Sequence, residues 1–163
     1  MLKKLQSNLV PAGEARFAIV ASEYNARYVN AMLRGARAEL KRAGAGSIQV
    51  IRVPGAYEIP LLAAELARPA AAGAAPPAAI LCLGVILRGE TVHAAHIGEA
   101  VSRALMDIQL QFGVPVIHEV LLLENEAQAR ARCLGREHNR GAEAARTALA
   151  MARVLRRVRR GLE

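Results

Sequence analysis

The chain has 163 residues, of which 53% are hydrophobic, and its formal net charge at pH 7 is +8. This length is enough to bury a full core as one domain, and the hydrophobic content excludes a mainly disordered protein. No apolar run approaches the length of a membrane span, and the first residues lack a signal-peptide pattern. We therefore expect a cytoplasmic protein without a membrane partner.

Apolar segments and turn residues divide the chain into alternating elements. Buried strands are predicted at 16–21, 48–53, 80–87 and 114–123. Helices are predicted at 26–42, 57–68, 91–112, 124–133 and 141–159. Segment 4–10 has the pattern of a short strand or an extended arm. Because strands alternate with helices, we expect an α/β fold, a three-layer sandwich with a central, mostly parallel four-stranded sheet flanked by helices.

The stretch 80–97 is the centre of this pattern, because a strand that is apolar on both faces runs into a glycine turn and a helix. Gly89 allows an unusual backbone there, and Thr91 can cap the helix that follows. Open amides at that helix end form an anion site, and His93 in the first turn can carry protons near neutral pH. These residues predict a phosphate site beside an acid–base group; the alternative is a histidine that is only packed or exposed.

Three turns should meet beyond the C-terminal ends of the strands, where ligands bind in such folds: 22–25, 54–58 and 88–93. Tyr24 and Tyr57 offer flat rings, Asn25 an amide and Glu58 a carboxylate. Together with the third turn, this set suits a planar polar heterocycle that has a hydroxylated side chain, next to a phosphate. Taken singly, the tyrosines could be ordinary packing residues, and Glu58 could be a carboxylate favoured by the helix dipole.

Metal, redox and nucleic-acid functions have weaker signals. Cys82 and Cys133 lack the spacing of a zinc or redox site, and no third ligand accompanies His93 and His96. A cluster of arginines near the end of the chain could bind nucleic acid: 153, 156, 157, 159 and 160. Aromatic residues make up only 3% of the chain, so few side chains are available for nucleic-acid bases to stack on. We expect no metal and no nucleic acid as main partner; the arginines can also form a solvated helix end or attract phosphorylated small molecules.

Several motifs resemble the 6,7-dimethyl-8-ribityllumazine synthase family in order and spacing. They are EYN at 23–25, VPGAYEIP at 53–60, LGVILRGETVH at 83–93, GVPV at 113–116 and NRGAEAA at 139–145. The resemblance covers nearly the whole chain. It implies one domain, 1–163, of flavodoxin-like fold, with 1–12 as a candidate intersubunit arm.

The resemblance also implies a reaction. In it, 5-amino-6-(D-ribitylamino)uracil condenses with 3,4-dihydroxy-2-butanone 4-phosphate to give 6,7-dimethyl-8-ribityllumazine, phosphate and water. This transferase reaction is the penultimate step of riboflavin biosynthesis and needs no cofactor. The implied assembly is a homopentamer with active sites between neighbours, and a decamer or a sixty-mer shell stays open.

Residue roles follow from the same resemblance. His93 is the implied catalytic acid–base residue. The ribityl pyrimidine site comprises Tyr24, Asn25, Ala56, Tyr57, Glu58, Val85, Ile86, Leu87 and His118. The phosphate site comprises Glu90, Thr91 and, from the neighbouring subunit, Arg132. Arg140 and Glu143 are supporting residues.

The chain departs from the family pattern at three of these positions. His118 stands where many members have phenylalanine, Arg140 where lysine is usual, and Val85 where threonine is frequent. Two alternatives stay open. One is a lumazine-binding scaffold without turnover, and the other is a nucleic-acid-binding protein that uses the arginine cluster.

Overall fold

The computed structural model describes residues 10–68, 75–135 and 138–161. Its four strands form one sheet in the order β2-β1-β3-β4, and every neighbouring pair is parallel. The strands are β1 (Arg16–Ser22), β2 (Ser47–Val53), β3 (Ala79–Leu87) and β4 (Val116–Leu123). The first part of the predicted arm, residues 4–9, lies outside the described residues.

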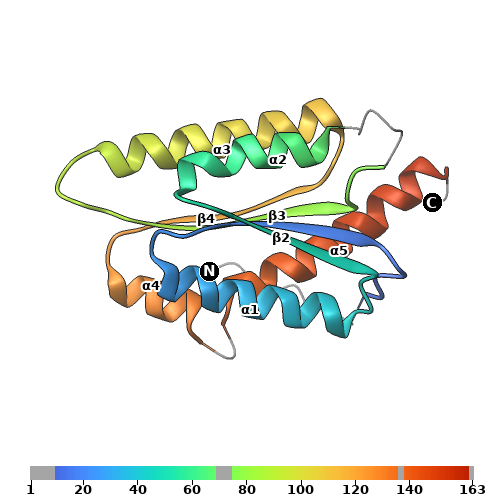
Figure 1. Ribbon diagram of the computed structural model, residues 1–163, viewed down its shortest axis with the longest axis horizontal. Helices are drawn as coiled ribbons and strands as arrows, with labels where there is room; N and C mark the ends of the chain where they lie inside the picture. The colour runs from blue at the N-terminus through green and yellow to red at the C-terminus, as the bar shows by residue number, and fades with distance from the viewer. Residues whose placement is uncertain (1–9, 69–74, 136–137, 162–163) are drawn as a thin grey trace.

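Helices cover both faces of the sheet. They are α1 (Ala26–Arg42), the short 3-10 helix η1 (Ala56–Glu58), α2 (Ile59–Ala67), α3 (His93–Phe112), α4 (Glu126–Cys133) and α5 (Arg140–Arg159). Figure 1 shows α2 and α3 on one face and α1, α4 and α5 on the other. The predicted three-layer α/β sandwich is therefore confirmed. Within the described ranges, no helix combines the length and the apolar character that a membrane span requires.

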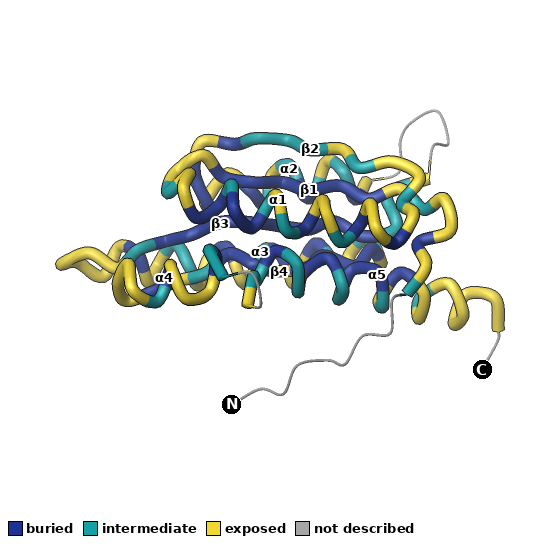
Figure 2. The backbone as a smooth tube through the Cα atoms, turned by 90° about the horizontal axis from the view of Figure 1, so that it is seen from below, coloured by how far each residue is buried: buried dark blue, intermediate teal, exposed yellow. Residues whose placement is uncertain are grey.

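Alternating side chains of the central strands supply two cores. Phe17 and Ile19 of β1 pack toward α1 and α5, whereas Val20 faces Ile59 of α2 and the inner face of α3. Figure 2 shows the result, with β1 and β3 buried between helices whose outer surfaces are exposed, and with β2 only partly buried at the edge of the sheet. The central strand β3 is buried along almost its whole length, as expected for a parallel strand covered on both faces.

Both cysteines are packing residues in this core. Cys82 on β3 and Cys133 at the end of α4 are fully buried. Burial raises the pKa of both thiols, that of Cys133 to about 11, so neither is a reactive thiolate near neutral pH.

Helices α1 and α5 cross at very short distance, and Gly141 makes this possible. A Cβ atom at position 141 would lie only 2.0 Å from the backbone oxygen of Met32 on α1. Just before this contact, Asn139 caps α5 by accepting a hydrogen bond from the Ala142 backbone N–H at 3.1 Å. The same side chain donates to the carbonyl oxygens of Ala31 and Cys133. The N-terminus of α5 is therefore fixed against α1 and α4.

The start of α3 differs from the prediction. The helix begins at His93 rather than at residue 91, and Val92 occupies the N-cap position without a side-chain cap. Thr91 is not the cap residue, although its hydroxyl accepts a long hydrogen bond of 3.4 Å from the His93 backbone N–H. Gly113 ends the helix in the left-handed conformation.

Candidate active site

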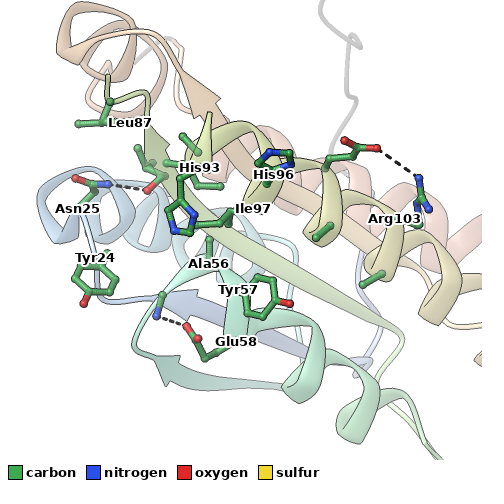
Figure 3. A pocket seen from close by; sticks show the side chains of 18 of the residues that line it. Tyr24, Asn25, Ala56, Tyr57, Glu58, Leu87, His93, His96, Ile97 and Arg103 are labelled. Carbon is green, nitrogen blue, oxygen red and sulfur yellow. Dashed lines mark hydrogen bonds and ion pairs between the residues drawn. The ribbon is translucent and has the colours of Figure 1, made fainter. Parts of the chain in front are cut away.

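An open cleft with a volume of about 1190 Å³ lies beyond the C-terminal ends of β1, β2 and β3. The structure brings together the three turns that the sequence places at this edge (Figure 3). The predicted site residues that line the cleft are Tyr24, Asn25, Ala56, Tyr57, Glu58, Val85, Ile86, Leu87, Thr91 and His93. Glu90 is exposed in the third turn and is not among the lining residues.

The first turn is tied to both neighbouring strands. Asn25 has the left-handed backbone conformation, and its Nδ2 donates a 2.7 Å hydrogen bond to the carbonyl oxygen of Val85 at the end of β3. The backbone N–H of Tyr24 donates to the carbonyl oxygen of Pro54 at 3.0 Å. These bonds fix the backbone and leave the Tyr24 side chain 70% exposed at the cleft mouth.

The second turn is closed by its own carboxylate. Gly55 donates its backbone N–H to Glu58 Oε2 at 2.8 Å. A larger residue would crowd this turn, because a Cβ atom would lie 2.8 Å from that oxygen and 3.2 Å from the Tyr24 ring. Tyr57 is 63% exposed, and Ala56 is buried behind it. The turn therefore presents one ring and one oriented carboxylate to the cleft.

The third turn presents His93 and backbone amides. His93 is the first residue of α3, and its ring points into the cleft toward the turns that carry Tyr24 and Ala56 (Figure 3). Gly89 and Thr91 line the same end of the cleft, where the first amides of α3 have no partner within the helix. A histidine next to a helix N-terminus can move protons beside a bound anion.

The cleft also extends along the exposed side of α3, which the sequence reasoning did not include. Its lining there comprises His96, Ile97, Glu99, Ala100, Arg103, Ala104 and Asp107. Arg103 and Glu99 form an exposed ion pair at 3.4 Å. Their spacing along one helix face was visible in the sequence, but nothing indicated that this face is left uncovered. Among the described residues, no group of three or more His, Cys, Asp or Glu side chains could hold a metal ion.

Besides Glu90, four predicted site residues do not line this cleft: His118, Arg132, Arg140 and Glu143. They lie around the outer edge of the sheet, on β4, α4 and α5. Together with Glu119 on β4, which the sequence reasoning missed, we call them the edge group.

His118 is held at the sheet edge in one tautomer. Its Nδ1 accepts the Val120 backbone N–H at 3.2 Å, so the ring proton sits on Nε2, which lies 2.7 Å from Ser102 Oγ. Ser102 in turn donates to the Gly98 carbonyl oxygen. Burial lowers the pKa of His118, which favours this neutral form.

Charged residues form the rest of the edge group. Arg140 donates from Nε to Glu119 Oε1 at 2.6 Å and from Nη1 to Glu143 Oε2 at 2.8 Å. Arg132 is exposed on α4, and its charge acts on Glu119. Glu119 was detectable as a single carboxylate within the apolar run 114–123, but its partner lies 21 residues away.

A parallel sheet with a polar, partly aromatic cleft beyond its strand ends is typical of α/β enzymes that bind small molecules. Residues 14–156 match the family described as 6,7-dimethyl-8-ribityllumazine synthase. A protein of that name from Stenotrophomonas maltophilia (strain R551-3) is 46% identical over 143 residues, which cover 86% of this chain and 89% of that protein. One from Xanthomonas euvesicatoria pv. vesicatoria (strain 85-10) is 43% identical, with 86% and 90% coverage. The chain belongs to the 6,7-dimethyl-8-ribityllumazine synthase family.

Proposed function

We propose that this chain is a transferase that makes 6,7-dimethyl-8-ribityllumazine. It condenses 5-amino-6-(D-ribitylamino)uracil with 3,4-dihydroxy-2-butanone 4-phosphate and releases phosphate and water, the penultimate step of riboflavin biosynthesis. The observation that carries the proposal is the family match over residues 14–156, joined to a cleft in which His93 faces the turns of Tyr24 and Glu58.

The pyrimidine substrate binds in the inner part of the cleft in this proposal. The Tyr24 ring stacks on the heterocycle, and the exposed backbone at the end of β3 lines its edge. Glu58 uses one oxygen to close its own turn, so its other oxygen is available to accept hydrogen bonds from ribityl hydroxyls. The mostly fixed backbone of the turns supports this role, because a preformed site orients the substrate before reaction.

Proton transfer is assigned to His93. The reaction requires an amine to attack a ketone, water and phosphate to leave, and a second amine to close the ring. Each of these steps moves a proton to or from nitrogen or oxygen. An exposed imidazole at the cleft end of α3 has the position and the chemistry for these transfers.

Phosphate binding is assigned to the third turn together with Arg132. Backbone amides near Thr91 supply donors, and a guanidinium pairs with phosphate oxygens in a bidentate way. Arg132 belongs to the edge group and does not line the cleft of its own chain. A neighbouring subunit therefore has to supply it, along with His118, and each active site is shared between two subunits.

The assembly that follows is a homo-oligomer. We propose a pentamer, in which the edge group of one subunit completes the cleft of the next; decamer and sixty-mer shell remain open. The whole chain, 1–163, would be one domain of this family, with 1–12 as the intersubunit arm. The cytoplasmic location expected from the sequence stays a prediction.

The proposed reaction is tested with both substrates and the purified protein, by following the absorbance of the lumazine product. Product formation supports the enzyme. A scaffold would bind the pyrimidine in calorimetry and form no product. A protein that binds neither substrate but retains RNA would favour the nucleic-acid alternative, although its arginines lie at the opposite end of the sheet, where Arg159 donates to the Gly113 carbonyl oxygen.

The shared site is tested by mixing two impaired variants, His93→Ala and Arg132→Ala, at a butanone phosphate concentration well below the KM of the Arg132→Ala variant. After subunit exchange, some interfaces combine an intact His93 with an intact Arg132, so activity should return toward about a quarter of the wild-type value if the variants mix at random. Subunits of a single variant, treated in the same way, should keep their reduced activity. If exchange occurs without recovery, or if light scattering finds an active monomer, the shared site is refuted.

A further inference from the structure

The last two turns of α5 carry the densest positive charge of the molecule. Five arginines stand there within eight residues, and we call them the arginine end: Arg153, Arg156, Arg157, Arg159 and Arg160. No acidic residue occurs between positions 144 and 161, and the net charge of the whole chain is +8. All five residues are exposed, and Figure 2 shows the end of this helix as an exposed segment. The arginine end therefore supplies most of the excess positive charge of the chain.

These arginines repel one another in the free protein. Arg153 and Arg157 are four positions apart, as are Arg156 and Arg160, and like charges at this spacing on a helix are unfavourable. The helix dipole favours cations only near the final turn, so it does not account for Arg153. Within the described residues, no carboxylate forms an ion pair with any of the five. An external anion would relieve this repulsion.

A small pocket of about 280 Å³ lies beside the arginine end. Arg156, Arg159 and Arg160 line it together with the loops that precede β3 and β4, and its lining in the described part of the chain includes no acidic and no aromatic residue. Arg159 is fixed there, because its Nη2 donates to the carbonyl oxygen of Gly113 at 2.7 Å. The pocket lies at the N-terminal ends of β3 and β4, at the opposite end of the sheet from the candidate active site.

The reaction proposed for the cleft does not account for this surface. The family match ends at residue 156, and three of the five arginines follow it. The pocket shares no lining residue with the cleft. The arginine end is therefore a second cationic surface, separate from the site that binds the substrates.

We infer that the arginine end binds nucleic acid through the phosphate backbone, as a second partner besides the substrates of the cleft. A guanidinium recognises phosphate by two parallel hydrogen bonds, which makes arginine the favoured residue for this contact. Arg153 and Arg160 lie about 10 Å apart along the helix axis, so the surface matches a series of phosphates rather than a single one. Because no aromatic residue lines the described pocket, bases do not stack there and binding is independent of sequence.

Other polyanions match this surface less well. An interfacial membrane helix inserts an apolar face rich in Trp, Phe or Leu, whereas the exposed apolar residues beside these arginines are Val154 and Val158. An acidic protein would be expected to add aromatic or aliphatic anchors to its charged contacts, because charges are depleted at the centre of protein–protein interfaces. Interfaces with nucleic acid are much more positively charged, as this surface is.

Binding of a short fluorescent single-stranded RNA of mixed sequence tests the inference, by anisotropy at several salt concentrations with the full-length protein. The affinity should fall about a hundredfold between about 50 and about 200 mM salt, as counterion release predicts for five phosphate contacts. The triple variant Arg153→Gln, Arg157→Gln, Arg160→Gln should bind more than about tenfold more weakly at the lower salt concentration, with a salt slope reduced by about two. A second RNA of equal length and different sequence should bind equally well.

Two control variants separate a local site from general charge and from misfolding. Arg27→Gln, Arg34→Gln, Arg37→Gln removes three exposed arginines of α1, so it lowers the net charge equally and should bind RNA nearly as well as wild type. Replacement of positions 153, 157 and 160 by lysine keeps the charge and should keep the salt slope. Circular dichroism verifies that each variant has the helix content of the wild type.

Polyglutamate and vesicles that contain phosphatidylserine, used as competitors, distinguish the other polyanions. Both should displace the RNA only at much higher concentrations of charge. Absence of RNA binding at about 50 mM salt, an equal loss in the α1 variant, or stronger binding of polyglutamate or of vesicles overturns the inference. Lumazine formation is measured separately, because its absence in the wild type refutes the proposed function and leaves the RNA measurement valid.

Discussion

The cleft and the edge group differ in how their side chains are held. In the cleft, backbone hydrogen bonds fix the turns, while Tyr24 and Tyr57 are mostly exposed and the His93 ring has no hydrogen bond within the described residues. In the edge group, the side chains bind one another, as Arg140 does with Glu119 and Glu143. The first region is open for a ligand, and the second has its charges oriented in advance, which is the arrangement that lowers the cost of binding an anion.

The largest effect is expected in the cleft. His93→Ala should slow lumazine formation by roughly ten- to a thousandfold, which is within or somewhat below the roughly hundred- to ten-thousandfold contribution usual for a general acid–base group. Binding of the ribityl pyrimidine should change little, since its contacts come mainly from the other two turns and the end of β3. Turnover measured at saturating substrate and calorimetry with the pyrimidine separate the two effects. His138→Ala, an exposed histidine outside the cleft, is the control. Normal turnover of His93→Ala would exclude the residue from the mechanism.

A smaller and selective effect is expected in the edge group. Arg132→Ala should raise the KM for the butanone phosphate by about ten- to a hundredfold and that for the pyrimidine much less, because a guanidinium pairs with phosphate oxygens. The control is Arg130→Ala on the same helix, whose guanidinium pairs with Glu126 at 3.1 Å. Initial rates with each substrate varied in turn give both constants. Parallel increases of the two KM values would remove the phosphate-specific role.

The smallest effect concerns pH and stability. Because burial lowers the folded-state pKa of His118 below its ordinary value of 6.5, the unfolded chain takes up this proton more readily as the pH falls. Wild-type stability should therefore decline below about pH 6.5, by a fraction of a kcal/mol because part of the His118 side chain stays in contact with solvent at the sheet edge. His118→Phe should lose this part of the pH dependence. Denaturant unfolding between about pH 5 and pH 8 measures this difference in the free energy of unfolding, with His138→Gln as control. Identical pH profiles of wild type and His118→Phe would contradict the prediction.

Much of the fold could be predicted because its signals are local. Continuous apolar runs locate the strands, and alternation with helices imposes a parallel sheet, which brings the three turns to one edge. The start of α3 could not be predicted, because Thr91 looks like a cap residue and yet the N-cap position is taken by Val92. No local rule favours valine there, so the contacts of the turn decide the boundary.

The candidate site could be predicted only where a sequence motif or the sheet topology indicates its residues. The cleft follows from the strand ends, whereas the roles of Arg132, Arg140 and Glu143 are expected only from the family resemblance and stay predictions. Glu119 could not be assigned, because a carboxylate in a strand does not reveal which partner it meets. Its ion pair depends on how α5 packs beside β4, which is a tertiary property.

The contact between Gly141 and Met32 limits which positions of this protein can be changed by engineering. Any side chain at position 141 would push α5 away from α1 and move Arg140 with it, so a change made for packing would also alter the chemistry. In the turns of the cleft, the Tyr24 and Tyr57 side chains are exposed and can be replaced without such a cost. A redesign toward other heterocycles should therefore vary Tyr24 and Tyr57 and leave the helix crossing intact.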